Sequence, residues 1–385
     1  MSRPERPIYL DFNATTPVAP EVLEAMLPYL RDEFGNPSST HPYGRRAKEA
    51  VERARAQVAE LLHARAEEIF FTSGGTEANN LAIRGVAQAR PERRHLLTST
   101  IEHPATERPC LHLERQGWTV SRAGVDAEGR LRVDEAAAAL RKDTALVTLI
   151  HANNETGVLQ PVRELAALAH AQGALVHTDA AQSVGKVPVD VERLGVDLLT
   201  VVGHKLYAPK GVGALYVRQG TPLQPFALGG GQEHGLRPGT ENVPYIVGLG
   251  AACELARGRM AQGTAALAEL RERLWWRLQA EVPGMRLTGH PTERLPNTLN
   301  VRFPGVRGSA VLAGAPEVAA STGSACHEGG ETASSVLLAM GLPPEDALGA
   351  VRLTLGHGTT AEDVDVAASS LARAWRAAKG DAALS

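Results

Sequence analysis

Residues 144–154 read TALVTLIHANN, an apolar and β-branched run that ends abruptly in histidine and asparagine. The length suits one strand, and apolar residues at most positions predict a strand that is covered on both faces. The run DLLTVV at residues 197–202 has the same character. Strands of this kind are typical of parallel sheets between two layers of helices. This stretch therefore decides the expected fold class, which is α/β.

On both sides of this stretch, helical patterns alternate with short strand-like runs. The clearest of these runs are IFFT (69–72), HLLTS (95–99), ALVHTD (174–179) and GALYV (213–217). The alternation predicts a doubly wound, mostly parallel sheet.

The pattern changes near residue 255, where a long helical stretch rich in Ala, Leu and Arg begins and runs to about residue 281. Shorter strand-like runs follow it. We therefore expect a large domain over residues 15–255. A smaller α+β domain would combine residues 1–14 with residues 256–385.

Composition and charge exclude several classes of protein. The chain has 385 residues, of which 43% are hydrophobic and 22% charged, and its net charge is -3. No strong positive field would draw it to nucleic acid, and no run approaches the roughly 18 apolar residues of a membrane span. The first residues resemble neither a signal nor a transit peptide. We expect a cytoplasmic protein that contacts neither membrane nor nucleic acid directly.

The cysteines are few and far apart. Cys110, Cys253 and Cys326 form no CxxC pair and no Cys/His cluster with metal-ligand spacing, so no metal site is expected. Cys110 and Cys253 lie in helical patterns with apolar neighbours, which favours burial. Cys326 instead lies in STGSACHEGG, residues 321–330, a stretch of small residues that predicts a flexible loop.

Candidate functional residues follow the predicted strands, where open α/β sheets bind their ligands. In FTSGGTEANN, Gly75 and Thr76 open a helix and could bind a phosphate, although a plain turn with Thr76 as N-cap fits as well. Asp179 ends a strand and Gln182 follows it. The carboxylate could pair with a protonated ring nitrogen, or it could cap a turn.

Further candidates end other strands. Lys205 follows His204 in GHKLYAPKG, and a desolvated lysine can form a Schiff base; Lys210, in a Pro–Gly turn, is the weaker candidate. His103 precedes a proline and could stack on a ring and move protons, or cap a helix. Asn154 could reach a ring hydroxyl or form a turn.

Two arginines complete the candidate set. Arg352, on a strand, could grip a carboxylate or form a surface ion pair. Arg237 lies in GGGQEHGLRPGTEN, residues 229–242, which has the composition of an anion-binding loop. Together these segments supply a phosphate loop, a lysine, an acid for a ring nitrogen, a stacking histidine, an arginine and a thiol. That combination indicates pyridoxal phosphate chemistry on an amino acid.

Read in order, these segments resemble the cysteine desulfurases of the NifS/IscS-like group. The matching stretches also include YLDFNATTP, FGNPSSTHPYG and LPNTLNVRFPGV, so the resemblance extends from about residue 9 to 360. It implies the aspartate-aminotransferase-like fold of fold-type-I enzymes and pyridoxal 5′-phosphate as cofactor. It also implies a homodimer.

The resemblance assigns roles toward the cofactor. Lys205 would bind it covalently, Asp179 would keep the ring nitrogen protonated, and His103 would stack on the ring. Asn154 and Gln182 would contact the ring hydroxyl. The phosphate would be bound by Gly75, Thr76 and His204. Thr240 of a partner subunit would also reach the phosphate.

The resemblance also implies how substrate is handled. Arg352, with Asn36 and Asn154, would bind the carboxylate of L-cysteine. Cys326, on the loop of about residues 321–333, would take the sulfur as a persulfide and pass it to an acceptor protein. An iron–sulfur scaffold or a tRNA-thiolation enzyme is the expected acceptor. A selenocysteine lyase or another class V aminotransferase-like enzyme remains the alternative.

The chain departs from the usual pattern of the group at a few positions. Val202 replaces a serine that usually binds the phosphate, so Thr200 or a backbone N–H would have to supply that contact. Ala208 stands where glycine is common. His327 and Glu328 follow the cysteine where small polar residues are more usual.

Overall fold

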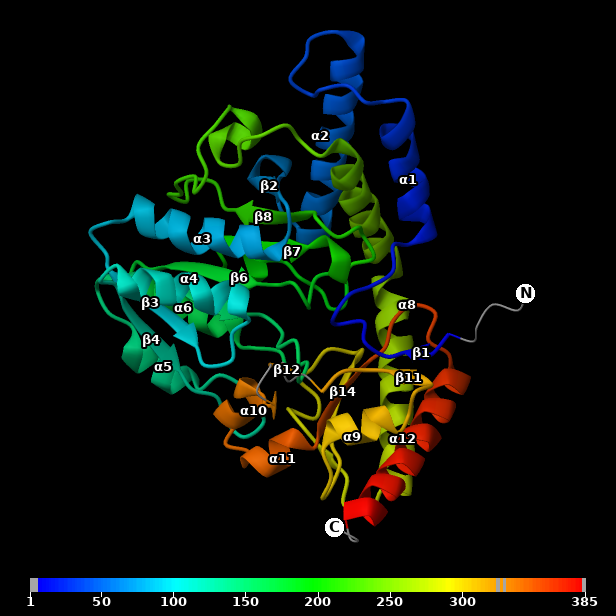
Figure 1. Ribbon diagram of the computed structural model, residues 1–385. Helices are drawn as coiled ribbons and strands as arrows, with labels where there is room; N and C mark the ends of the chain where they lie inside the picture. Colours follow the sequence, from blue (N-terminus) through cyan, green and yellow to red (C-terminus); the bar gives the residue numbers. More distant parts are fainter. Residues whose placement is uncertain (1–5, 323–325, 328–329, 383–385) are drawn as a thin grey trace.

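The computed structural model describes residues 6–322, 326–327 and 330–382, and it is built around a seven-stranded sheet (Figure 1). The strand order is β2-β8-β7-β6-β5-β3-β4. The strands are β2 (Ile69–Thr72), β3 (His95–Ser99), β4 (Thr119–Ala123), β5 (Thr144–Ile150), β6 (Leu175–Asp179), β7 (Leu198–Val202) and β8 (Gly213–Val217). Strands β4, β3, β5, β6 and β7 run parallel, whereas β8 is antiparallel to both of its neighbours. The mostly parallel α/β sheet expected from the sequence is confirmed.

Helices cover both faces of this sheet, because alternate residues of its strands point to opposite sides. Leu96, Leu146 and Leu198 pack on one face in a core with α3 (Gly75–Ala89) and α4 (Pro104–Arg115). Their neighbours Leu97, Val147 and Leu199 pack on the other face. The helices on that second face include α1 (Pro20–Arg31), α2 (Pro42–Leu62), α5 (Val133–Ala139), α6 (Val162–Ala171) and α7 (Val191–Leu194).

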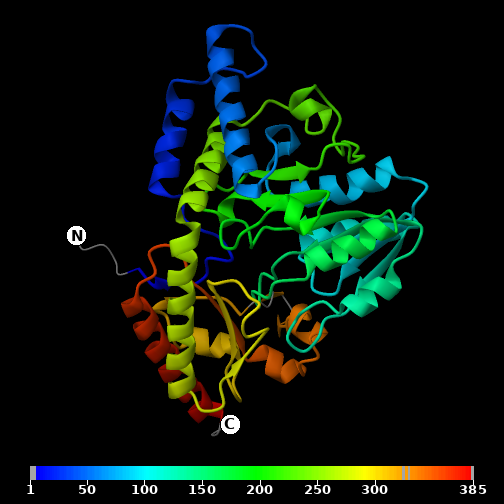
Figure 2. The ribbon, with the colours of Figure 1, turned by 180° about the vertical axis from the view of Figure 1, so that it is seen from behind.

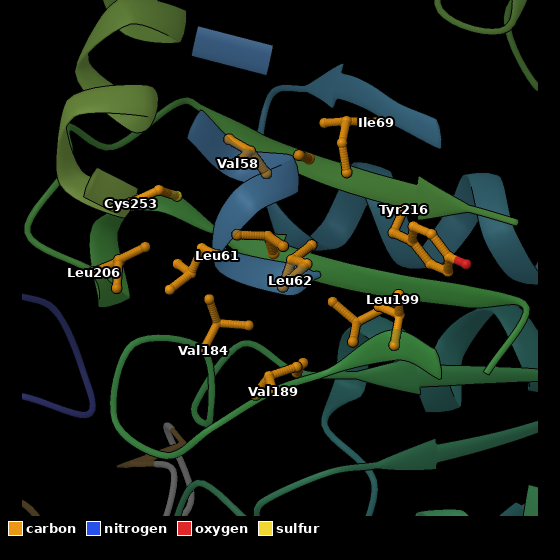
Figure 3. Packing of buried hydrophobic residues seen from close by; sticks show 14 of the residues in the cluster. Val58, Leu61, Leu62, Ile69, Val184, Val189, Leu199, Leu206, Tyr216 and Cys253 are labelled. Carbon is orange, nitrogen blue, oxygen red and sulfur yellow. The ribbon is translucent and has the colours of Figure 1, made fainter. Parts of the chain in front are cut away.

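The core on the second face also anchors the loops that follow β6 and β7. Val184 and Leu206 belong to it, together with Val58, Leu62 and Tyr216 (Figure 3). Gly185 allows close packing here, since a Cβ on it would lie 2.1 Å from Leu206 Cδ1. In these two loops, the polar residues at the sheet edge are therefore followed closely by apolar residues that pack in the core and fix the position of the loop.

A second body packs below the sheet edge in Figure 1, around a small antiparallel sheet. Its strand order is β14-β10-β9, and β1 pairs in parallel with β11 beside it. The strands are β1 (Ile8–Tyr9), β9 (Arg286–Leu287), β10 (Thr298–Arg302), β11 (Val318–Ala319) and β14 (Ala350–Thr354). The helices are α9 (Gly308–Ala313), α10 (Ser335–Ala339), α11 (Pro344–Leu348) and α12 (Ala361–Ala382).

One helix connects the two bodies. Helix α8 (Val243–Glu281) begins earlier than the sequence predicted and crosses residue 255 without a break (Figures 1 and 2). Its first half contributes Ile246 and Leu249 to the core under the large sheet, and its second half contributes Leu274 and Leu278 to the core of the smaller body. The division of the chain into residues 15–255 against 1–14 and 256–385 remains a proposal.

The segment around Cys326 is a short hairpin in the part that the structure describes. Cys326–His327 form β12, which pairs antiparallel with β13 (Gly330–Glu331). Glu328 lies outside the described residues, as do residues 323–325. The sequence predicted a loop here without a hairpin, because two-residue strands carry no detectable period.

Candidate active site

A cavity of about 350 Å³ lies at the carboxyl edge of the large sheet, next to the smaller body. Its lining comes from the loops after β2, β3, β5, β6 and β7 and from β14. The lining residues are Asn13, Ala14, Gly75, Thr76, His103, Ala105, Ile150, Asn154, Asp179, Ala181, Gln182, Val202, His204, Lys205 and Arg352. The strand-end residues that the sequence singled out thus meet in one cavity.

Lys205 is held at the cavity by the N-terminal segment. It ends a short 3-10 turn after β7, and its Nζ donates to the carbonyl oxygens of Asn13 at 2.6 Å and Ala14 at 2.7 Å. Burial, reinforced by the charge of Arg352, lowers the pKa of Lys205 to about 8. A lysine with this pKa is partly neutral near physiological pH, and the neutral amine is the form that attacks a carbonyl.

Asp179 is buried at the end of β6 and has defined donors. Asn79 Nδ2 on α3 donates to Asp179 Oδ2 at 2.7 Å, and the backbone N–H of Ala181 donates to Asp179 Oδ1 at 3.0 Å. Asn79 Nδ2 also donates to Thr106 Oγ1 on α4 at 3.1 Å. These donors hold the carboxyl group in one orientation, from which it can accept from a protonated ring nitrogen.

His103 caps a helix and also lines the cavity, so the cap does not exclude a role at the site. Its Nδ1 accepts from the backbone N–H of Ala105 at 3.1 Å at the start of α4. In the neutral ring the proton is therefore on Nε2. Burial is the main cause that lowers the pKa of His103, and the charge of Lys205 adds to it. A neutral imidazole can stack on a flat ring and exchange a proton through Nε2.

The end of the cavity beneath α3 has the chemistry of an anion site. Gly75 and Thr76 form the first turn of this 15-residue helix, whose N–H groups favour a phosphate. Gly75 is required, because a Cβ there would lie 2.6 Å from Val202 Cγ2. Thr200 does not replace the missing serine hydroxyl, since its Oγ1 is 3.0 Å from His177 Nε2. Burial, with the charge of Lys205, lowers the pKa of His204 to about 4, so this residue lines the same end as a neutral ring.

Arg352 reaches the cavity from the smaller body. Its Nη2 lies 2.7 Å from Asp11 Oδ1, and its Nη1 donates to the carbonyl oxygen of Asn154 at 3.1 Å. Within the described residues, its buried Nε has no hydrogen-bond partner. Gln182 and Asn154 lie on the same wall.

The segment that carries Cys326 is fixed to this site on both sides. Before it, Ser321 pairs with Arg352: the backbone N–H of Arg352 donates to the Ser321 carbonyl at 2.7 Å. After it, the hydroxyl of Ser334 donates to Glu155 Oε2 at 2.5 Å, next to Asn154. Both ends of the hairpin segment are therefore attached to the wall of the cavity, whereas the side chain of Cys326 lies outside the described residues.

Two predicted residues are not brought to the cavity within one chain. Asn36 is exposed in the loop between α1 and α2, where its Oδ1 accepts from the backbone N–H of Ser38 at 2.9 Å. Thr240 is exposed in the loop before α8. Lys210 lines an adjoining recess of about 390 Å³, together with Thr76 and His204.

The sequence did not single out the residues that hold the others in place. Asn13 accepts from Lys205, and Asp11 pairs with Arg352; both lie in YLDFNATTP, which was matched only as a whole. Asn79 lies in FTSGGTEANN, beside the residues that were chosen. The signal for these residues in the sequence was their polar side chains close to the chosen residues. Their partners could not be identified, because these lie far away in the sequence.

These residues fit pyridoxal 5′-phosphate. The cavity has the volume of a small-molecule site, with an amine of lowered pKa, a buried carboxylate and a helix N-terminus around it. Arg352 adds a guanidinium to the lining, and a guanidinium can bind the carboxylate of an amino acid.

Comparison with known proteins agrees with this chemistry. The family Aminotransferase class-V matches residues 8–366. The cysteine desulfurase of Trichormus azollae is 48% identical over 360 residues, which cover 93% of this chain and 90% of that protein. A solved structure described as a NifS-like protein has a TM-score of 0.89 at 37% identity, covering 95% of this chain and 98% of its own. SspA in complex with cysteine has a TM-score of 0.81 at 39% identity, covering 90% and 98%.

The chain belongs to the class-V aminotransferase family, whose cofactor is pyridoxal 5′-phosphate. Within that family it belongs to the cysteine desulfurases, which confirms the resemblance found in the sequence.

Proposed function

We propose that the protein converts L-cysteine to L-alanine with pyridoxal phosphate and transfers the sulfur to Cys326 as a persulfide. The observation that carries the proposal is a single cavity that combines Lys205, Asp179 and Arg352, with the Cys326 segment attached to its wall. Relatives over nearly the whole chain are named cysteine desulfurases, and SspA binds cysteine in its solved structure.

Each cofactor-binding residue contributes through an atom that the structure places at the cavity. When bound, pyridoxal phosphate supplies an electron sink for the amino acid. Lys205 Nζ would hold it covalently, and Asp179 would keep a proton on its ring nitrogen. His103 would stack on the ring and move protons through Nε2. The first turn of α3 and His204 would receive the phosphate.

Arg352 would bind the carboxylate of L-cysteine. Its guanidinium contacts Asp11 through Nη2 and the Asn154 carbonyl through Nη1, so the substrate carboxylate would share or displace one of these contacts. Asp11 therefore holds the guanidinium in place before the substrate binds. Asn154, whose carbonyl contacts Nη1, would lie beside the bound carboxylate.

Cys326 would take the sulfur in a balanced exchange. Its thiolate attacks the sulfur of L-cysteine, the S–S bond of the persulfide forms, and the Cβ–S bond of the substrate breaks. The carbon fragment keeps the electron pair, takes up a proton and leaves as L-alanine. A protein thiol then accepts the outer sulfur, with an iron–sulfur scaffold or a tRNA-thiolation enzyme as the proposed acceptor.

A homodimer would explain the positions of Thr240 and Asn36. Thr240 is exposed on its own chain, and the recess lined by Thr76, His204 and Lys210 is open to a phosphate-binding residue of a partner. Large apolar side chains are also exposed in the same two loops: Phe34 is 76% exposed and Leu228 is 91% exposed. A second copy would cover such surface and complete the site.

The cellular location proposed is the cytoplasm. Among the described residues, no helix is both long and apolar enough to cross a membrane.

The test is to incubate the purified protein with L-cysteine and a dithiol reductant and to measure alanine and sulfide together. We expect equal amounts of the two products, and Cys326→Ser should lose both while it keeps the visible band of the cofactor. Cys253→Ala is the matched control, because this cysteine is fully buried in the core and should not contribute. Absence of both products from a cofactor-loaded wild type, with turnover of selenocysteine instead, would contradict the proposal.

A further inference from the structure

Lys186 is a second buried lysine beside the cavity, and the mechanism described above does not use it. It is 8% exposed, and its Nζ lies 2.9 Å from Gln182 Oε1 and 3.3 Å from Asn13 Oδ1. Both of these acceptors are neutral amide oxygens. Burial, with the charges of Lys205 and Arg352, lowers the pKa of Lys186 to about 7, so holding a lysine here is costly and indicates a role beyond packing.

The contacts of Lys186 determine which way the amide of Gln182 faces. A lysine amine donates, so the atom of Gln182 beside it must be the oxygen. The other end, Nε2, donates to the carbonyl oxygen of Asn13 at 3.0 Å, and a carbonyl can only accept. Two independent partners therefore demand the same orientation. Because Gln182 lines the cavity, the hydrogen-bonding group that it has left to offer is its second N–H.

The same cluster joins both lysines through Asn13. The carbonyl oxygen of Asn13 accepts from Lys205 and Gln182, while its side-chain oxygen accepts from Lys186. The charged groups that act on Lys186 are Lys205 and Arg352, and both repel a positive charge there. An anionic oxygen bound in the cavity would relieve that repulsion.

We propose that Lys186 is a positioning residue of the cofactor site: it fixes the amide of Gln182 as a hydrogen-bond donor toward the ring oxygen of pyridoxal phosphate. This inference rests on the proposed function, because Gln182 is expected to contact that oxygen. A donor at the ring oxygen stabilises its anionic form. A positive charge on Lys186 acts in the same direction, but burial and the charges of Lys205 and Arg352 lower its own pKa to about 7, so the oriented amide carries most of the effect.

The experiment follows the visible absorption of the lysine-bound cofactor as a function of pH. In Lys186→Met the amide can rotate and the charge is gone, so the pKa of the absorption change should rise by roughly one unit. Lys186→Gln keeps a donor for Gln182 Oε1 without the charge, and its shift should be smaller. Lys142→Met is the control, because Lys142 is exposed in a loop before β5.

A double variant separates positioning from general loosening of the site. In a Gln182→Leu background, Lys186→Met should add only the charge part of its shift, because the amide that it orients is absent. Binding of pyridoxal phosphate to the apoprotein gives a second readout, with an affinity loss of up to about tenfold expected for Lys186→Met. If Lys186→Met does not fold, Lys186→Gln decides the question, because it keeps a donor for Gln182 Oε1 and should retain most of the wild-type pKa; a shift of a full unit there would overturn positioning as the role of Lys186.

The outcomes also separate this inference from the proposed function. A folded Lys186→Met that titrates like the wild type would overturn the role of Lys186, even if alanine is formed normally. A wild type that shows the cofactor band but forms no alanine would contradict the proposed function, and the titration would still report on Lys186. A wild type that binds no pyridoxal phosphate would overturn both.

Discussion

The carboxylate of Asp179 depends on a residue from another element for its alignment. Asn79 stands one hundred positions away in the sequence, and it links Asp179 on β6 to Thr106 on α4 through a single Nδ2. Asn79 is completely buried. Its role is to hold the acid in one orientation, since a freely rotating carboxylate would meet a ring nitrogen less often.

Asn79→Ala should therefore weaken binding of pyridoxal phosphate to the apoprotein by about tenfold, because hydrogen bonds to charged groups contribute about 1.5–3 kcal/mol. Thr106→Val removes only the outer contact of Asn79, and it should have a smaller effect in the same direction. Fluorescence titration of the apoproteins measures both affinities, and thermal unfolding shows whether the variants are folded. Equal affinities in wild type and Asn79→Ala would contradict the assigned role.

At the scale of residues, the sequence could predict which side chains reach the cavity but not which side chains hold them. Asp179, Lys205 and Asn154 end strands, and the edge of a parallel sheet brings strand ends together whatever the rest of the fold. The partners Asn79, Lys186 and Asp11 act through contacts made only after folding. No local pattern identifies such contacts, so these residues were missed.

At the scale of elements, the loop before α8 is fixed by a buried ion pair. The Glu233 carboxylate receives Arg55 Nη2 at 2.8 Å and the backbone N–H of Phe71 at 2.7 Å. Glu233 also has a positive φ of 47°, as does His234 at 53°, so the contact holds the backbone in an uncommon conformation. This loop leads to Thr240, which the homodimer proposal places at the site of a partner subunit.

Glu233→Ala should lower the free energy of unfolding by up to about 3–5 kcal/mol, because it removes the buried carboxylate partner of Arg55, which keeps only Glu52 and the Ile69 carbonyl. If the loop completes the phosphate site of a second subunit, the variant should also bind pyridoxal phosphate more weakly. Urea unfolding and cofactor titration measure these two effects, and light scattering gives the oligomeric state. Glu254→Ala is a suitable control on α8, since Glu254 contacts Gln57 at an exposed position. A monomeric wild type with full cofactor affinity would contradict the homodimer.

The start of α8 shows why one boundary was misplaced. The helix turns its first half toward the core of the large body and its second half toward the core of the smaller body. The apolar face therefore changes along the helix, and no single periodic stripe extends over it. The change of pattern near residue 255 falls inside the helix, which begins at Val243 and still contributes Ala256 to the core of the large body.

At the scale of the whole molecule, buried histidines make stability depend on pH. Burial is the main cause that lowers the pKa values of His95, His151 and His177 to about 4 each. Their ring nitrogens contact hydroxyl groups: His177 Nδ1, for example, is 2.8 Å from Thr148 Oγ1. As pH falls below about 6.5, these histidines become protonated in the unfolded chain, whereas in the folded protein they stay neutral until about pH 4. The free energy of unfolding therefore falls with pH in this range.

Buried Glu102 opposes this trend by one proton. Burial raises its pKa to about 8, so between its ordinary value and pH 8 the folded protein holds a proton that the unfolded chain releases. His204, whose pKa burial also lowers to about 4, makes four such histidines against one carboxyl group, which leaves a net difference of about three protons between pH 5 and 6. The free energy of unfolding should then fall by about 4 kcal/mol for each pH unit of acidification in that window.

His177→Asn isolates one of these protons. The variant loses packing at every pH, but its pH dependence should be shallower than that of the wild type by about 1.4 kcal/mol per pH unit, which is the effect of one proton. Urea unfolding at pH 5.0, 5.5 and 6.0 gives the slopes, and the difference between proteins cancels the contributions of all other groups. His112→Asn should keep the wild-type slope, because His112 is exposed on α4 and contacts only Gln116 among the described side chains. Parallel slopes for wild type and His177→Asn would mean that His177 takes up its proton equally in the folded and unfolded protein, and acid sensitivity would then have to come from the carboxylates.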